Sequence, residues 1–370
     1  MTLAQTNPLA IIASELPGFS TQFAIDLMRS DYGMKILSAK SLVSERDQNF
    51  QLLCADGRKL VLKIANAAED PQVTDFQVKA LQHIEHYQSQ FGERFNAPRI
   101  VPTPDGRSQL SIEDGSVSCI ARVVTYVEGV PLGDDEPSAE LCRNTGIYLA
   151  ELGRSLKDFR HAGSDQNLLW DMKRALRLRE LLRHIRPASL ADRVSRCLDE
   201  FEDRVLPEFP SLRWQVIHND LNPDNILLDV AGGSKVVGVI DFGDMLAAPL
   251  IVDLAVATSY MRLGAGDPLA GIAACLSGYH SVTPLLTQET DLLLDLVRTR
   301  LAATISIRHW RISEKSPDDP YLQKILQENT AEEFLARLDE LPAEHVRRTF
   351  REVCASQDMA PRARTAGHQP

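Results

Sequence analysis

Two short polar segments, each placed directly after an apolar run, constrain the fold of this 370-residue chain most strongly. The first reads H-x-D-x-x-x-x-N over residues 218–225, and the second reads D-F-G-D over residues 241–244. The apolar runs before them, WQVI and VVGVI, have the length and composition of short strands. Loop ends on a rigid scaffold are where chemistry tends to lie. We therefore expect one small hairpin to bring together three side chains: Asp220, Asn225 and Asp241.

Phosphoryl transfer explains why these residue types occur at this spacing. The Asp220 carboxylate can accept the proton of a substrate hydroxyl, while Asn225 and Asp241 offer oxygen ligands of the kind that Mg²⁺ prefers. Asp, Asn and Pro are also ordinary turn formers, so the alternative is a loop without chemistry. The second strand and the D-F-G segment favour the functional interpretation. His218 is expected to brace the loop through hydrogen bonds, because Asp220 already supplies a base.

A lysine interrupts an otherwise apolar strand upstream. Residues 60–65 read LVLKIA, and a lysine is rarely buried without a partner. We expect Lys63 to meet nucleotide phosphates, with an outward-facing strand lysine as the alternative. Residues 41–50 precede this strand and contain no glycine, so backbone approach to phosphates is not favoured there. Ser44 and Asn49 could donate from their side chains instead, or the segment could be an ordinary polar hairpin turn.

These segments together resemble the aminoglycoside phosphotransferase family of small-molecule kinases. The stretches "HNDLNPDNILLD" and "GVIDFGDM" around Asp220 and Asp241 look most like its hydroxylysine kinase branch. The segments "SERDQNF" (44–50), "LVLKIAN" (60–66), "LLWDMKRA" (168–175) and "DPYL" (319–322) agree with this and follow the same order. The chain lacks the Arg of the protein-kinase H-R-D loop and an A-P-E segment, which argues against a protein kinase.

The resemblance implies an α+β, two-lobed protein-kinase-like fold, with a small antiparallel sheet and one main helix in the N-lobe and a mostly helical C-lobe. Gly, Pro and acidic residues cluster at 129–133, so we expect an N-lobe over 20–129 and a C-lobe over 130–354. The tail 355–370 is expected to be disordered. The implied donor is ATP or GTP with Mg²⁺. Hydroxylysine is the leading acceptor, with homoserine, choline, ethanolamine and aminoglycosides as alternatives.

The family pattern raises one difficulty and one further expectation. In kinases, a helix after the lysine strand carries a Glu that pairs with the lysine. Here that helix offers Asp75 or Gln77, so the pair is made by Asp75, replaced by a neutral hydrogen bond from Gln77, or absent. A non-catalytic nucleotide-binding regulator is the rival that this gap favours. The resemblance also implies that Asp253, inside an apolar helix, anchors the backbone of the catalytic loop.

Acceptor-binding residues have no motif of their own. An amino-acid acceptor carries a carboxylate, which Arg binds bidentately, and an ammonium, which Trp attracts. Asp244 is expected either to face the acceptor or to cap a helix. The predicted helix 288–313 supplies further candidates that could equally form a basic surface: Arg298, Arg300, Arg308, Arg311, His309 and Trp310.

Composition excludes several other classes of function. The net charge of −11 argues against nucleic acid or an anionic membrane as the main partner and mildly favours a cationic small molecule. The six cysteines are scattered, without a C-x-x-C pair or a nearby His at zinc spacing, which indicates thiols in a reducing compartment. No signal peptide or membrane-length apolar run is apparent, so we expect a cytoplasmic protein.

Overall fold

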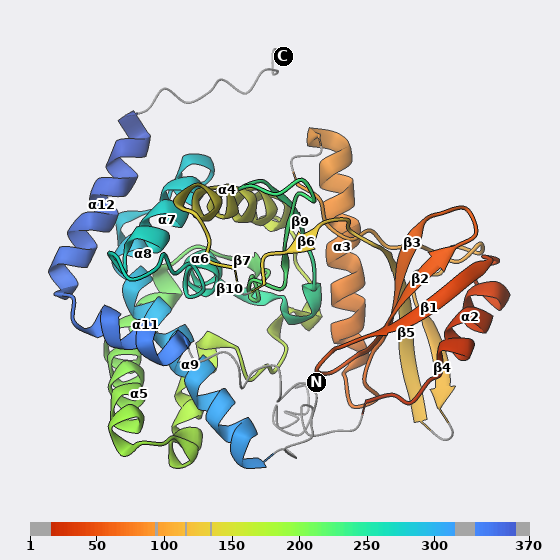
Figure 1. Cartoon of the computed structure of the whole chain (residues 1–370), viewed down its shortest axis with the longest axis horizontal. Coiled ribbons are helices and arrows are strands. Elements are labelled where there is room, and N and C mark those ends of the chain that lie inside the picture. The colour runs from red at the N-terminus through yellow and green to blue at the C-terminus, as the bar shows by residue number, and fades with distance from the viewer. Residues whose placement is uncertain (1–15, 93–94, 115–116, 134, 315–329, 360–370) are drawn as a thin grey trace.

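The chain folds into two lobes, a twisted antiparallel sheet beside a bundle of helices (Figure 1). This computed structural model describes residues 16–92, 95–114, 117–133, 135–314 and 330–359. The expected α+β architecture is confirmed. The segment 319–322, one of those that resemble the family, lies outside the described residues.

The first lobe is built on a five-stranded sheet in the order β1-β2-β3-β5-β4, with every neighbouring pair antiparallel. The strands are β1 (Ile36–Leu42), β2 (Gln48–Cys54), β3 (Lys59–Ile64), β4 (Leu110–Asp114) and β5 (Val117–Thr125). Helix α2 (Thr21–Ser30) packs on one face and shares its core. The side chain of Ser20 caps α2 by accepting a hydrogen bond from the Phe23 backbone N–H.

Alternation along β3 decides where Lys63 lies. Leu60, Leu62 and Ile64 are buried in the core shared with α2, and successive strand side chains point to opposite faces. The Lys63 side chain therefore leaves the sheet on the face turned toward the helical lobe. There its Nζ lies 3.1 Å from Oδ1 of Asp241.

Helix α3 (Pro71–Phe91) lies between the sheet and the helices (Figure 1). Asp70 caps it by accepting a hydrogen bond from the backbone N–H of Gln72, and Pro71 occupies the first turn, where no N–H is needed. The buried residues of α3, among them Phe76 and Ile84, belong to the core of the helical lobe rather than to the core beneath the sheet.

The second lobe is mostly helical. Its described α-helices are α4 (Ala139–Leu156), α5 (Ala188–Glu200), α6 (Leu250–Thr258), α7 (Ala270–Val282), α8 (Thr287–Asp291), α9 (Leu293–Glu314), α11 (Thr330–Asp339) and α12 (Ala343–Met359). Short 3-10 and π segments join them: η1 (Ala162–Asp165), η2 (Met172–His184), η3 (Phe201–Val205), η4 (Leu206–Ser211) and η5 (Phe242–Asp244). Within the described ranges, no helix is both long and apolar enough to cross a membrane.

The sequence predicts a disordered tail from residue 355, and this start is too early. Helix α12 continues to Met359, past residue 355. Cys354 is buried, and one turn later Asp358 Oδ1 lies 3.4 Å from Nε2 of His280 on α7. These contacts hold the last turn of α12 on the lobe. Residues 360–370 lie outside the described part.

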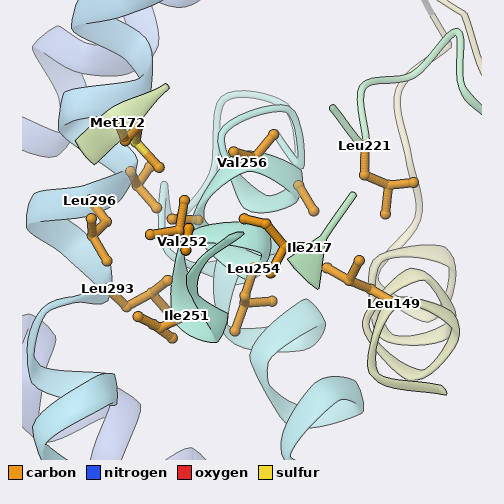
Figure 2. Packing of buried hydrophobic residues seen from close by; sticks show 14 of the residues in the cluster. Leu149, Met172, Ile217, Leu221, Ile251, Val252, Leu254, Val256, Leu293 and Leu296 are labelled. Atoms are coloured by element: carbon orange, nitrogen blue, oxygen red, sulfur yellow. The ribbon is translucent and has the colours of Figure 1, made fainter. Parts of the chain in front are cut away.

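Four short strands frame the two polar segments. They are β7 (Trp214–Ile217), β8 (Ile226–Leu228), β9 (Val236–Val239) and β10 (Leu246–Pro249). The expected β8–β9 hairpin is present, and β6 (Val130–Pro131) pairs with β8, while β7 pairs with β10. Beneath them α6 is buried along its whole length, and Figure 2 shows its Ile251, Val252 and Leu254 packed among Ile217 and Leu293.

Helices α4 and α7 cross at two glycines with almost no space between them. A Cβ on Gly278 would overlap the carbonyl oxygen of Arg143, and one on Gly146 would overlap the carbonyl oxygen of Cys275. Backbone atoms cannot swing away as a flexible side chain can. The close crossing therefore requires glycine at both positions.

Gly278→Ala is expected to lower the free energy of unfolding by about 3 kcal/mol, because an added methyl group in a packed core forces the backbone apart. Urea denaturation followed by circular dichroism measures the loss. Gly266→Ala is the matched control, since a Cβ there meets nothing within 4 Å. Equal stability of the two variants would show that the helices can separate at no cost.

Candidate active site

The loop from β7 to β8 carries Asp220 and holds its carboxylate in place. Asn222 Nδ2 lies 3.2 Å from both carboxylate oxygens, and Asn225 Nδ2 donates to Oδ2 at 2.9 Å. Burial and the neighbouring Asp244 carboxylate raise the pKa of Asp220, while the Arg300 guanidinium opposes this. The side chain is 22% exposed, so the carboxylate remains open to a ligand.

Asp253 fixes the backbone of this loop from below. Its Oδ2 accepts a hydrogen bond from the N–H of His218 at 3.1 Å, and its Oδ1 accepts one from the N–H of Asn219 at 2.8 Å. Asn219 has a φ of 64°, which non-glycine residues rarely adopt. The expected anchoring role of Asp253 is confirmed, and it explains how a buried carboxylate on α6 finds donors.

His218 joins the two polar segments. Its ring is fully buried, with Nε2 3.1 Å from the carbonyl oxygen of Ile240 and Nδ1 3.3 Å from the backbone N of Asp220. The ring also packs edge-on against Phe242. Burial lowers the pKa of His218 to about 4, so the ring is neutral and donates from Nε2 while accepting at Nδ1. The structure confirms the bracing role expected for it.

Asp241 and Asn225 lie at the same end of the β8–β9 hairpin. The backbone N–H of Ile240 donates to the carbonyl oxygen of Asn225 at 3.1 Å, which places the next residue, Asp241, beside that loop. Lys63 lowers the pKa of Asp241 to about 2, so this carboxylate is ionised at neutral pH. The φ of Asp241 is 60°, a strained value of the kind that occurs at functional sites.

The Asn225 and Asp241 side chains offer oxygen atoms of the kind that Mg²⁺ takes as ligands. Asn225 Nδ2 is occupied by the backbone and side-chain oxygens of Asp220, at 2.8 and 2.9 Å, which leaves Oδ1 for a cation. The described residues contain no cluster of three or more His, Cys, Asp or Glu side chains able to hold a metal ion. A cation here would thus take further oxygens from phosphates and water, as Mg²⁺ commonly does.

Neither helix residue considered as a partner for Lys63 contacts it. Asp75 lies 3.0 Å from Nε2 of His161, and Gln77 donates to the carbonyl oxygen of Gly243 at 3.1 Å. The ion pair of Lys63 is made with Asp241 instead. Of the three predicted possibilities, Asp75 and Gln77 are wrong, because His161 holds Asp75 and because Gln77 lies between Gly243 and Arg122 of β5. Gln77 still ties α3 to the D-F-G segment.

The glycine-free segment forms a loop over residues 43–47 that reaches the other lobe. Ser44 lies in this loop, whereas Asn49 lies within β2 opposite Lys63, with its buried Oδ1 unpaired among the described residues. Two neighbouring side chains make the contacts that the sequence did not predict. Arg46 forms an ion pair with Asp244, and Glu45 forms one with Arg311.

A cavity of about 650 Å³ opens beside Asp220, between this loop and the helical lobe. Asp244 lines it while paired with Arg46, and α6 begins after Pro249, so Asp244 is not a helix cap. The cavity wall carries both signs of charge. Besides Asp220 and Asp244, its charged side chains are Glu45, Asp135, Glu136, Asp224, Glu333, Arg262, Arg300, Arg308, Arg311 and Arg337.

The sequence of residues 39–285 matches the model of the phosphotransferase enzyme family, APH. The chain belongs to this family. A phosphotransferase acting on a hydroxyl group of a small molecule accounts for a carboxylate beside a charged cavity. The match covers both polar segments and Lys63, and of the site residues it leaves out only those of α9 and α11.

Relatives of this phosphotransferase are known from sequence and from structure. Hydroxylysine kinase of Xenopus laevis is 26% identical, covering 96% of this chain and 99% of its own. The microcompartment-associated aminopropanol kinase has a TM-score of 0.65 at 16% identity, covering 90% of this chain and 98% of that chain. An amicoumacin kinase solved with AMP-PNP and Ca²⁺ has a TM-score of 0.64 at 14% identity, covering 88% and 95%. Both structures share the fold.

Only some of the candidate acceptor-binding residues on the long helix α9 of this phosphotransferase line the cavity. Arg298 points away from the cavity and pairs with Glu200 and Asp339, and His309 lies beside Glu332. The expected role for Trp310 is not supported, because its side chain is buried in the lobe core. Three arginines of α9 do line the cavity: Arg300, Arg308 and Arg311.

Trp170 is the aromatic residue that sequence reasoning missed. It lines the cavity, and the Arg300 guanidinium lies 4.4 Å from the centroid of its ring. It lies within the LLWDMKRA segment that resembles the family, which was the available signal. Periodicity alone gives none, since Trp170 precedes an irregular 3-10 stretch.

Proposed function

We propose that this phosphotransferase transfers the γ-phosphoryl group of ATP or GTP to a hydroxyl of an amino acid, with 5-hydroxy-L-lysine as the leading acceptor. The observation that carries the proposal is the Asp220 carboxylate, held by Asn222 and Asn225 at the wall of a cavity with both signs of charge. The name of the Xenopus relative supports the choice of acceptor.

Each residue at the site has a proposed role. Asp220 accepts the proton as the acceptor oxygen bonds to the γ-phosphorus and the bond to the departing diphosphate oxygen breaks. Asn225 and Asp241 hold Mg²⁺, which supplies positive charge to the phosphates. Lys63, Ser44 and Asn49 are the proposed nucleotide contacts. Lys63 meets the phosphates while keeping Asp241 ionised.

The charges of the cavity suit a zwitterionic acceptor. Hydroxylysine carries two ammonium groups and one carboxylate. Acidic side chains such as Glu136 and Glu333 can receive ammonium groups, and the arginines of α9 can receive a carboxylate. Choline and ethanolamine have no carboxylate and would leave these arginines without a ligand partner.

A diphosphate-release assay on the purified protein tests the proposal. ATP and GTP are each supplied with hydroxylysine, homoserine, choline, ethanolamine or kanamycin, with and without Mg²⁺. We expect Mg²⁺-dependent release that needs hydroxylysine. Diphosphate release with only one of the other acceptors would show that this compound, and not hydroxylysine, is the acceptor. Nucleotide binding without release for any acceptor would favour a non-catalytic regulator.

We further propose that the lobes divide near residue 129, giving an N-lobe over 20–129, whose helix α3 packs on the other lobe, and a C-lobe over 130–354. We also propose that the protein acts in the cytoplasm, without a nucleic-acid or membrane partner. The net charge of −11 supports the second statement. All six cysteines lie in the described part as buried free thiols, which agrees with a reducing compartment.

A further inference from the structure

We propose that Arg300 binds the carboxylate of the acceptor, and that this contact makes the site select hydroxylated amino acids over the matching amino alcohols. The inference rests on the proposed phosphoryl transfer at this cavity, but not on hydroxylysine being the acceptor. It assigns to one side chain the recognition of a chemical class.

The first ground is that Arg300 is buried and that two of its N–H groups have no hydrogen-bond partner among the described residues. Its side chain is 1% exposed, yet Nε and Nη1 have no hydrogen-bond partner among the described residues. Its Nη2 forms an ion pair with Asp220, 3.3 Å from Oδ1, and lies 3.5 Å from the hydroxyl of Tyr260. Unpaired donors on a buried cation are costly, and a bound carboxylate would satisfy them.

The second ground is that the guanidinium is held ready at the cavity wall. It lies over the ring of Trp170, 4.4 Å from the centroid, and both residues line the cavity. Stacking on an aromatic face fixes the plane of the guanidinium. A fixed planar fork loses little freedom on binding a carboxylate, and its geometry favours carboxylates over neutral polar groups.

The third ground is that the other arginines of the cavity already have partners. Arg308 pairs with Glu332, and Arg311 pairs with Glu45. Arg337 donates to backbone carbonyls of the 264–266 turn, and Arg262 donates to the carbonyl oxygen of Ser259. Arg300 also pairs with Asp220, but its Nε and Nη1 have no partner among the described residues, so it is the arginine best suited to take a new anion.

The position of Arg300 also suits the reaction. Since its Nη2 lies beside Asp220, a hydroxyl on Asp220 and a carboxylate on Arg300 would belong to one short molecule. The competing explanation is that Arg300 stabilises charge on the phosphoryl group being transferred. In that role Arg300 would act equally on acceptors with and without a carboxylate. A comparison of such acceptors therefore distinguishes the two explanations.

The experiment compares acceptors that differ only in the carboxylate, using the full-length protein. The pairs are 5-hydroxy-L-lysine with 1,5-diaminopentan-2-ol, and homoserine with 3-aminopropan-1-ol. For Arg300→Gln we expect kcat/KM to fall about 100-fold for the amino acid, mostly through KM, and less than about 3-fold for the amino alcohol. Arg300→Lys should recover part of the preference for the amino acid, because lysine keeps the positive charge but lacks the paired N–H donors of the guanidinium.

Arg298→Gln is the matched control, because it removes the same charge from α9 at a position outside the cavity. It should leave the acceptor preference unchanged. An equal fall for both members of a pair in Arg300→Gln would overturn the inference in favour of a role in phosphoryl transfer. No fall for either member would exclude Arg300 from the site.

Calorimetric binding of each pair to the wild type, Arg300→Gln and Arg300→Lys is measured alongside turnover. Tighter binding of the amino acid that is lost with Arg300 supports the inference even if no acceptor is phosphorylated. In that case the proposed function fails and the carboxylate site stands. Turnover with equal affinity for both members of each pair would overturn the carboxylate site and leave the proposed function standing.

Discussion

Asp220→Asn is expected to lower kcat about 1,000-fold while leaving the affinity for Mg²⁺-nucleotide within about 3-fold of wild type. The amide has the size of the carboxylate, and its oxygen can still accept from Asn222 and Asn225. It cannot accept the proton of the acceptor hydroxyl. The loss therefore falls on the chemical step, which diphosphate release measures, while calorimetry measures nucleotide binding.

Asp229→Asn serves as the control for this variant. Asp229 follows β8 at the turn of the hairpin and is absent from the cavity lining, so the change removes a carboxylate close in sequence without touching the site. It should leave turnover unchanged. Turnover of Asp220→Asn at a rate near that of wild type would show that the proton passes to another group.

Asp241→Asn is expected to lower kcat by a similar factor and, in addition, to abolish the effect of Mg²⁺ on nucleotide affinity. The carboxylate stays ionised because Lys63 holds its pKa at about 2, and only the ionised form is a strong ligand for a hard cation. Nucleotide titrations with and without Mg²⁺ measure the effect. The Asp220 variant is the internal control, since it should retain the Mg²⁺ effect.

These two variants separate binding from chemistry at one site. If Asp241→Asn bound nucleotide with the Mg²⁺ dependence of wild type, the cation would be held elsewhere. The fit of Asn225 and Asp241 to a Mg²⁺ site would then have to be abandoned. A loss of Mg²⁺ dependence in both variants would instead mean that Asp220 contributes to holding the cation.

Local sequence patterns predict the part of the site that a short stretch of chain brings together. Asp220, Asn225 and Asp241 are joined by one hairpin, so strand and turn signals suffice to place them at its ends. Alternation along β3 likewise places Lys63 on the face away from the core beneath the sheet. In each case the position follows from a period of two and from neighbours within about 25 residues.

Contacts between distant segments are not encoded in any such pattern. The partner of Lys63 depends on how α3 is oriented against the helical lobe, and the pair of Arg46 with Asp244 joins residues 198 positions apart. Helix α9 is buried on nearly all sides, so its sequence has no polar face to show that Arg300 meets the cavity while Arg298 does not.

The packing of α3 determines which parts of the protein can move as rigid bodies. Its apolar face belongs to the core of the helical lobe, and Gln77 bonds it to the D-F-G segment. The sheet with α2 has a separate core, but it also meets α3, since Arg122 of β5 donates to Oε1 of Gln77. A rotation of the sheet that left α3 in place would carry Lys63 and the 43–47 loop with it and would break this contact. It would separate Lys63 from Asp241 while Gln77 kept its hydrogen bond to the carbonyl oxygen of Gly243.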